Sequence, residues 1–220
     1  MKKFTTTLIL FFLFVVQTFG QSKTAAEESL DDLTEFYLQT FQKELKKNNV
    51  EDFFIVKHVQ YGTSITSTHD SDYCEHDKQY RLYAFWKESN AYWLKVFDNC
   101  GGFVPIKLKD KSAIEFYFQN YDKLKFEEVE SYKTKPDSIA NGLIYSFRSS
   151  KSHSPLKYYW FYKNSIVIKK SFDEYSLETN KESPNINYEK NHILALVKLN
   201  EICNKIIEKY AKRKNLKREK

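Results

Sequence analysis

Two aromatic runs joined by a short polar turn constrain the fold of this chain more than any other feature. The runs are Gln79–Lys87 and Ala91–Asp98, and Glu88-Ser89-Asn90 lies between them. Strand-forming runs separated by a short polar turn are the sequence signature of a β-hairpin. Strands joined in this way pair antiparallel. The sequence therefore predicts an antiparallel sheet built around this hairpin.

The same alternation with a period of two recurs along the chain. Phe53–Val59 alternates before the hairpin, and Phe103–Lys109 follows it as a strand that Pro105 confines to an edge or a bulge. A tight turn at Lys163-Asn164 joins the last two of the later runs. These later strand-like runs are Leu124–Val129, Leu143–Arg148, Leu156–Tyr162 and Ser165–Lys170.

Three other segments have the helical period. A capping box at Thr24 opens an amphipathic helix that Asn48-Asn49 can end, and a second box at Ser112 opens a short helix. A long helix follows Pro184 and carries apolar residues as far as Tyr210. The order helix, strands, helix, strands, helix predicts an α+β domain. Its antiparallel sheet or sheets hold about seven or eight strands, with the helices packed on them.

The first residues predict export. Met1-Lys2-Lys3 is followed by an unbroken apolar core, Leu8–Val16, and by small residues at Thr18 and Gly20. This order is typical of a secretory signal peptide over residues 1–20, and the core is about half as long as the ~20 residues of a membrane-spanning helix. We therefore expect a secreted or periplasmic chain of residues 21–220 that folds as one domain.

Cysteine spacing gives one interpretation of the stretch His69–Asp77, which reads HDSDYCEHD. Cys74 precedes the first strand of the aromatic hairpin and Cys100 follows the second, so antiparallel pairing brings them to the same end. Exported proteins meet oxidising conditions. The sequence predicts a Cys74–Cys100 disulfide, and it predicts that Cys203, in the apolar stripe of the last helix, is a buried thiol.

The same stretch supports two metal-site alternatives. Asp70, Asp72, Cys74 and His76 share parity, and alternate residues of an extended segment lie about 6.6 Å apart, which lets neighbouring ligands converge. With Cys74 the set would suit zinc. With Cys74 in a disulfide, the carboxylates of Asp70 and Asp72 and the imidazole of His76 remain. The simplest interpretation is a solvated acidic loop without a cofactor.

The aromatic strands also offer a binding surface. Tyr158, Trp160 and Tyr162 share one face of their strand, and Trp86 and Trp93 of the first hairpin extend the pattern. An exposed aromatic strip would stack on sugars or contact a partner. The alternative is that these rings pack against one another and against the helices.

The C-terminus is strongly basic. Residues 209–220 hold seven Lys and Arg side chains. Such a tail can bind acidic surfaces, such as anionic glycans, membrane headgroups or nucleic acid. The alternative is the ordinary end of a long helix, where cations meet the negative end of the dipole and the last turn frays.

The leading functional hypothesis is an exported, non-catalytic binding or structural domain. Its ligand would contact the aromatic sheet faces and the loops of residues 62–77 and 149–155. The alternative is a secreted hydrolase, with or without metal, that uses Asp70, Asp72 and His76. A third interpretation is a catalytic pair of Cys100 with His58, His76, His153 or His192, although a chain with five His residues also provides such pairs by chance.

Overall fold

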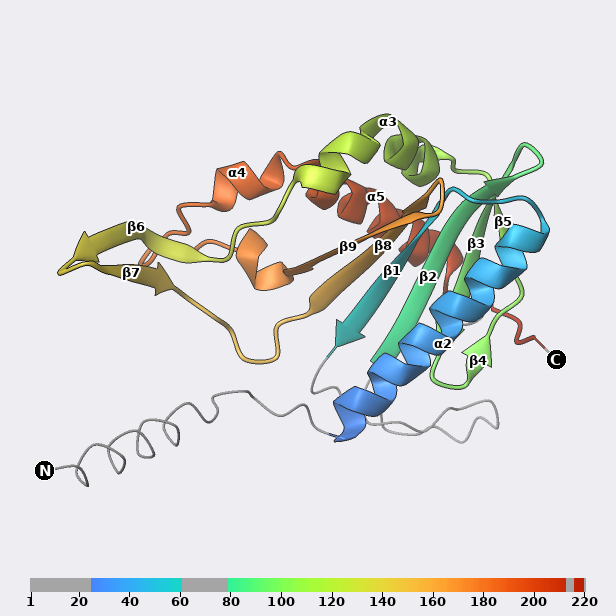
Figure 1. Cartoon of the computed structure of the whole chain (residues 1–220), viewed down its shortest axis with the longest axis horizontal. Coiled ribbons are helices and arrows are strands. Elements are labelled where there is room, and N and C mark those ends of the chain that lie inside the picture. Colours follow the sequence, from blue (N-terminus) through green and yellow to red (C-terminus); the bar gives the residue numbers. More distant parts are fainter. Residues whose placement is uncertain (1–24, 61–78, 213–215, 220) are drawn as a thin grey trace, which may run out of the picture. The chain divides into compact units, whose positions relative to one another are not determined.

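The structure is a computed structural model, and it describes residues 25–60, 79–212 and 216–219 (Figure 1). Its internal contacts divide the chain into residues 1–36 and residues 37–220. Helix α2 (Ala25–Lys47) runs across this boundary. The sheet, the second half of α2 and the remaining helices belong to residues 37–220. That residues 21–220 form a single domain stays a prediction.

Seven strands form one antiparallel sheet, which confirms the predicted α+β class. The strand order is β4-β3-β2-β1-β8-β9, and β5 pairs with β3. The first strand, β1, therefore lies in the middle of the sheet, between β2 and β8. The bounds are β1 (Phe53–Gln60), β2 (Gln79–Glu88), β3 (Ala91–Asp98), β4 (Gly101–Gly102), β5 (Ile106–Leu108), β8 (Leu156–Lys163) and β9 (Ile166–Asp173).

Two-residue turns fix the register of the hairpins in this sheet. Ser89 and Asn90 join β2 to β3 with φ values of 47° and 62°. Asn164 and Ser165 join β8 to β9 with φ values of 48° and 65°. Positive φ at both central residues is the mark of a type I′ turn, whose twist matches that of the flanking strands. Asn tolerates this left-handed conformation better than most residues, which explains its place in both turns.

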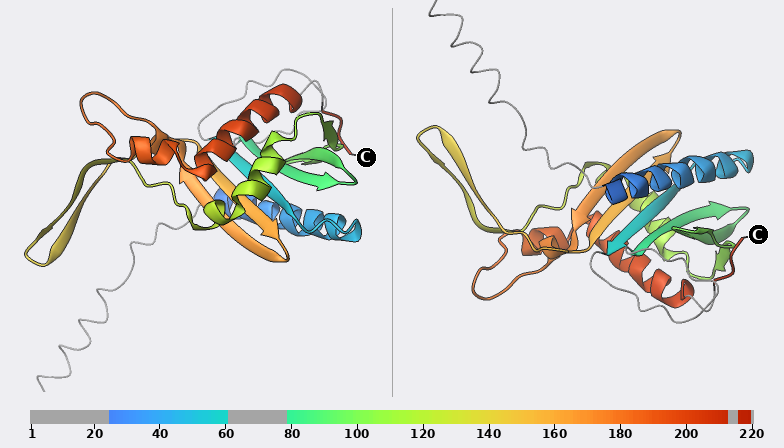
Figure 2. Two further views of the ribbon diagram at one scale, coloured as in Figure 1. Left: turned by 90° about the horizontal axis from the view of Figure 1, so that it is seen from above. Right: turned by 90° about the horizontal axis from the view of Figure 1, so that it is seen from below.

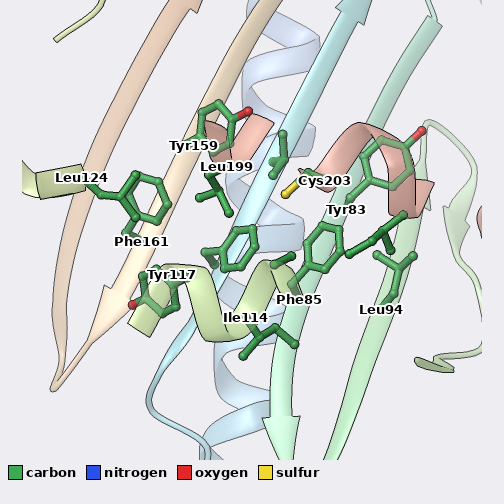
Figure 3. Packing of buried hydrophobic residues seen from close by; sticks show 14 of the residues in the cluster. Tyr83, Phe85, Leu94, Ile114, Tyr117, Leu124, Tyr159, Phe161, Leu199 and Cys203 are labelled. Atoms are coloured by element: carbon green, nitrogen blue, oxygen red, sulfur yellow. The ribbon is translucent and has the colours of Figure 1, made fainter. Parts of the chain in front are cut away.

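One face of the sheet holds the main apolar core. It is covered by α3 (Ser112–Phe126) and α5 (Ala195–Tyr210), and the short α4 (Tyr188–His192) precedes α5 (Figure 2). Two phenols in this core are buried with their hydroxyls satisfied: Tyr117 donates to the carbonyl of Tyr162, and Tyr159 donates to Asn200 Oδ1, both at 2.7 Å. Figure 3 shows how strand and helix residues interleave here, among them Tyr83, Phe85, Leu94, Ile114, Leu124, Phe161, Leu199 and Cys203.

The second half of α2 packs on the other face of the sheet. Phe41 is 1% exposed, and its ring meets the rings of Phe53, Trp86 and Phe97 edge-on. Leu38 and Leu45 lie on the same stripe of the helix and are also buried. The predicted amphipathic helix is thus confirmed, and its apolar stripe is what covers the sheet. Among the described helices, none combines the length and the apolar composition needed to cross a membrane.

A separate hairpin consists of β6 (Lys133–Ala140) and β7 (Leu143–Arg148). These two strands pair with each other and with no other described strand. Figure 2 shows the ribbon extending away from the seven-stranded sheet. The predicted strand at residues 143–148 is confirmed as β7.

The predicted strand at Leu124–Val129 is wrong. Helix α3, expected to be short, continues to Phe126, past a local distortion at Asn120 where φ is −116° and ψ is 15°. Leu124 is 0% exposed and faces the same core as Tyr117, two helical turns earlier. An apolar residue at every seventh position suits a helix that buries one face. This helical spacing determines the structure of the segment, and its weak strand-like alternation does not.

Candidate binding surfaces

The five aromatic residues predicted to bind a ligand lie on the face of the sheet that α2 covers, and most are buried. Trp86, Trp160 and Tyr162 are 4%, 9% and 5% exposed. Trp93 and Tyr158 are partly buried. The rings stack on one another, Trp86 on Trp93 and Tyr158 on Trp160, with centroids 6.2 and 6.3 Å apart. The face therefore leaves Trp93 and Tyr158 as the rings with most contact to solvent.

Two indole groups on this face lack a hydrogen-bond acceptor. The Nε1 atoms of Trp93 and Trp160 are buried, and neither has a partner within the part of the chain that the structure describes. A buried N–H without an acceptor costs about 1–3 kcal/mol. The face is thus dominated by ring packing, with two unpaired donors.

Buried lysines lie among the same aromatic rings. Lys95 is 3% exposed, and its ammonium lies between the carboxylates of Glu44 and Glu219 at 3.1 and 2.9 Å. The ammonium also lies 5.3 Å from the ring centroid of Phe97. Lys57 is 5% exposed and lies 5.4 Å from the ring centroid of Tyr158. Such partners offset part of the cost of taking an ammonium group out of water.

The end of the chain packs on the edge of the sheet. Helix α5 ends at Tyr210, and residues 216–219 are described again beside the sheet. The backbone amide of Val104 instead donates to the carbonyl of Lys217 at 2.8 Å, and that of Glu219 donates to Gly102 at 3.2 Å. These bonds cover an edge that would otherwise expose unpaired backbone groups.

Arg218 fixes this tail through its side chain. Its guanidinium donates to both carboxylate oxygens of Asp98, at 3.0 and 2.8 Å, and lies 4.6 Å from the ring centroid of Phe103. Asp98 Oδ1 also accepts from the backbone amide of Cys100 at 2.9 Å. At least this basic residue of the tail is engaged within the molecule. Binding of acidic surfaces by the tail stays a prediction.

The acidic loop lies outside the described residues. Asp70, Asp72, Cys74 and His76 all fall in residues 61–78, so the metal site and the hydrolase hypothesis stay predictions. Among the residues that the structure does describe, no three metal-binding side chains cluster. The strand register places Cys100 at the predicted end of the hairpin, because Arg81 of β2 lies opposite Asp98 of β3. The Cys74–Cys100 disulfide likewise stays a prediction.

Thiol counting tests the disulfide. Cys203 is a free cysteine, 0% exposed, and burial raises the pKa of its thiol, so it is protonated and shielded. We expect no reactive thiol in the native protein, one per chain after denaturation without reductant, and three after denaturation with reductant, measured with a chromogenic disulfide reagent. Three thiols in denatured, unreduced protein would contradict the Cys74–Cys100 bond.

His58, considered above as a partner for Cys100, is held neutral. Its cross-strand neighbours are Arg81 on β2 and Lys157 on β8. Burial, then the charges of Lys157 and Arg81, lower the pKa of His58 from 6.5 to about 3. Its ring lies 5.0 Å from the ring of Tyr83. These contacts describe a partly buried histidine whose charged form is strongly disfavoured.

The largest exposed apolar surface on the described strands lies on the β6–β7 hairpin. All six residues of β7 are exposed, as are the last six residues of β6. The exposed fractions are 77% for Ile139, 61% for Leu143, 72% for Ile144, 45% for Tyr145 and 40% for Phe147. These five residues are called the hairpin surface. Monomeric proteins rarely leave so many large apolar side chains together in water unless they have a partner.

Sequence reasoning missed this surface, although one signal was present. Asn141-Gly142 joins the two strands with φ values of 52° and 78°. Asn-Gly between apolar residues is the strongest short-range hairpin signal. The strand before it reads Lys-Thr-Lys-Pro-Asp-Ser, which has little strand preference of its own. The turn was therefore visible in the sequence, whereas its first strand was not.

Two buried asparagines hold the base of the hairpin. Asn191 is 0% exposed: its Oδ1 accepts from the amide of Glu130 at 3.0 Å, and its Nδ2 donates to the carbonyls of Glu130 and Ser176 at 2.8 and 2.9 Å. Asn185 Oδ1 accepts from the amide of Lys133 at 3.2 Å, where β6 begins. The hairpin is thus rooted by hydrogen bonds and not by an apolar core of its own.

Comparison with known proteins adds nothing to these surfaces. No family model, no curated protein and no solved structure matches the chain.

Proposed function

We propose that this chain is an exported, non-catalytic domain that binds a component of the cell envelope through the hairpin surface. The observation that carries the proposal is the exposure of five large apolar side chains on a ribbon that packs against no other described strand. An isolated two-stranded hairpin is marginally stable in water. A partner that covers the hairpin surface would stabilise it.

The rest of the domain supports the proposal that the hairpin binds the partner while the sheet holds the hairpin in place. The seven-stranded sheet is covered by α3 and α5 on one face and by the second half of α2 on the other, so it serves as a rigid base. Asn185 binds the backbone of Lys133, where the hairpin begins, and Asn191 binds the backbone of Glu130 just before it. A rigid scaffold that presents an apolar projection suits binding better than it suits chemistry.

Envelope fractionation tests the proposal. The exported form of the protein is purified from an expressing host. It is then mixed with isolated envelopes of the producing organism, and the envelopes are sedimented. We expect the unaltered protein to sediment with the envelopes. Replacing Ile139 and Ile144 by serine should lower the bound fraction by at least about tenfold, because each isoleucine loses its gain from burial.

The β8–β9 hairpin offers a matched control. Ile166 and Val167 are 57% and 41% exposed beside a type I′ turn, so replacing both by serine removes two exposed apolar side chains elsewhere. This control should bind as the unaltered protein does. The proposal is wrong if the two double variants bind equally well, or if the unaltered protein stays in solution.

The secreted-hydrolase alternative stays a prediction. Its three residues, Asp70, Asp72 and His76, lie outside the described residues, so no observation of the structure favours it.

A further inference from the structure

We infer that the hairpin surface binds an anionic phospholipid surface, into which the end of the β6–β7 ribbon inserts to a shallow depth. This inference rests on the proposed function and names the partner of the same site. The inference is based on the order of side chains along the ribbon, the positive charge at the base of the ribbon and the apolar side chains on both faces of the ribbon.

From the turn to the base of the ribbon, the side chains change from aliphatic to aromatic to basic, which is the order of polarity across a membrane interface. Ile139, Leu143 and Ile144 lie beside the turn and are the most exposed apolar residues of the hairpin. Tyr145 and Phe147 come next, and tyrosine favours the boundary between hydrocarbon and headgroups because its ring is apolar and its hydroxyl is polar. Basic residues follow at the base. An aliphatic end, an aromatic middle and a cationic base match hydrocarbon, boundary and phosphates in turn.

The charge of the ribbon is complementary to anionic headgroups. Between residues 133 and 148 there are three basic side chains, Lys133, Lys135 and Arg148, and one acidic side chain, Asp137. Asp137 pairs with Lys133 at 2.7 Å. Lys135 and Arg148 are exposed, and the ammonium of Lys135 lies 5.8 Å from the ring centroid of Phe147. Basic residues near an anionic membrane strengthen binding.

The dimensions of the ribbon agree with insertion to the boundary region. Arg148 is four residues beyond Ile144, which is about 13 Å along an extended strand. Interfacial elements bury their apolar side about 5–10 Å into the headgroup boundary. With Ile144 at that depth, Arg148 lies among the phosphates. The unpaired backbone groups on the outer edges of β6 and β7 prevent deeper insertion, because hydrocarbon offers them no hydrogen bonds.

Both faces of the ribbon carry apolar side chains near the turn, which favours a fluid partner over a protein surface. Ile139 lies opposite Ile144, and these two share one face. Ala140 lies opposite Leu143, and they share the other face with Tyr145. Docking on a protein groove or sheet would cover mainly one face. Strand addition to β6 is also opposed by Pro136 and by its register shifts at Lys135 and Ser138.

Vesicle sedimentation tests the inference without any other protein. The exported form of the chain is mixed with vesicles of phosphatidylcholine alone, or with about 30% phosphatidylglycerol added. We expect binding to the anionic vesicles to be at least about tenfold stronger, and to weaken when the salt is raised to about 0.5 M. Replacing Ile139 and Ile144 by serine should weaken binding to the anionic vesicles at least about tenfold. Replacing Lys135 and Arg148 by glutamine should remove the preference for anionic lipid.

The Ile166→Ser, Val167→Ser variant serves again as the control and should bind vesicles as the unaltered protein does. Urea unfolding of every variant checks that the domain is folded. Binding to envelopes through the hairpin without binding to either kind of vesicle would overturn the lipid inference and leave the proposed function intact, with a protein partner. Equal binding to both kinds of vesicle, or an equal loss in the control, would also overturn it. Failure in the envelope assay would instead overturn the proposed function.

Discussion

Replacing Asn191 by aspartate is expected to lower the free energy of unfolding by about 3–5 kcal/mol, the range found when a buried charge has no compensating partner. The Nδ2 of Asn191 donates to the carbonyls of Glu130 and Ser176 in a site that is 0% exposed. An aspartate places an oxygen against those two carbonyl oxygens. The midpoint and slope of urea unfolding at pH 7 measure the change.

Asn180 provides a matched control for this substitution. Its Nδ2 donates to the hydroxyl of Tyr132 at 3.2 Å, but the residue is exposed, so Asn180→Asp removes a donor in the presence of water. We expect a change within about 0.5 kcal/mol there. The deficit of Asn191→Asp should also shrink at pH 4, where the carboxyl is protonated and donates again. Equal costs at the two positions would show that Asn191 is not the anchor described.

Acidification is expected to destabilise the protein through His58, by about 2–3 kcal/mol between pH 7 and pH 4.5. The pKa of His58 is about 3 in the folded chain, below its ordinary value of 6.5. In the window between these two values the unfolded chain binds more protons than the folded chain. Stability from this group is therefore fully present above pH 6.5 and is lost as the pH falls toward 3.

The variant His58→Phe isolates this contribution. Phenylalanine keeps an aromatic ring against Tyr83 and does not titrate. We expect urea midpoints close to those of the unaltered protein at pH 7 and a clear advantage for the variant at pH 4.5. Carboxylates also titrate over this range, but they contribute to both proteins alike. If both lose the same stability on acidification, His58 is not the group responsible.

The sheet was predictable because its determinants are local. The turns at Ser89-Asn90 and Asn164-Ser165 lie beside aromatic runs whose alternation is strong, so the sequence specifies both strands and the connection between them. β6 was not predictable in the same way. Pro136 and Asp137 disfavour a strand, and the segment is extended because it pairs with β7 across the Asn141-Gly142 turn. Its structure comes from a partner strand and not from its own residues.

The sequence pattern of a single strand also could not predict which face of the aromatic strands is exposed. A period of two divides β8 into one face with Tyr158, Trp160 and Tyr162 and another with Tyr159 and Phe161, but it treats the two faces alike. Which face meets solvent depends on where the helices pack. Helices lie on both faces, and so Trp160 and Tyr162 are buried. The more exposed apolar side chains of the described strands lie instead on the β6–β7 hairpin, which the sequence analysis did not identify.

The central position of β1 has a consequence for how the chain assembles during synthesis. β1, β2 and β3 are close in sequence and can pair as soon as they are made, but the second neighbour of β1 is β8, in which Tyr162 pairs with Phe53. Until β8 arrives, roughly a hundred residues later, the early meander presents an unpaired and strongly apolar edge to any other nascent chain. The opposite edge waits still longer, because residues 216–219, which cover it, follow β8 in the chain. The incomplete sheet is therefore the stage of assembly that is most prone to aggregation.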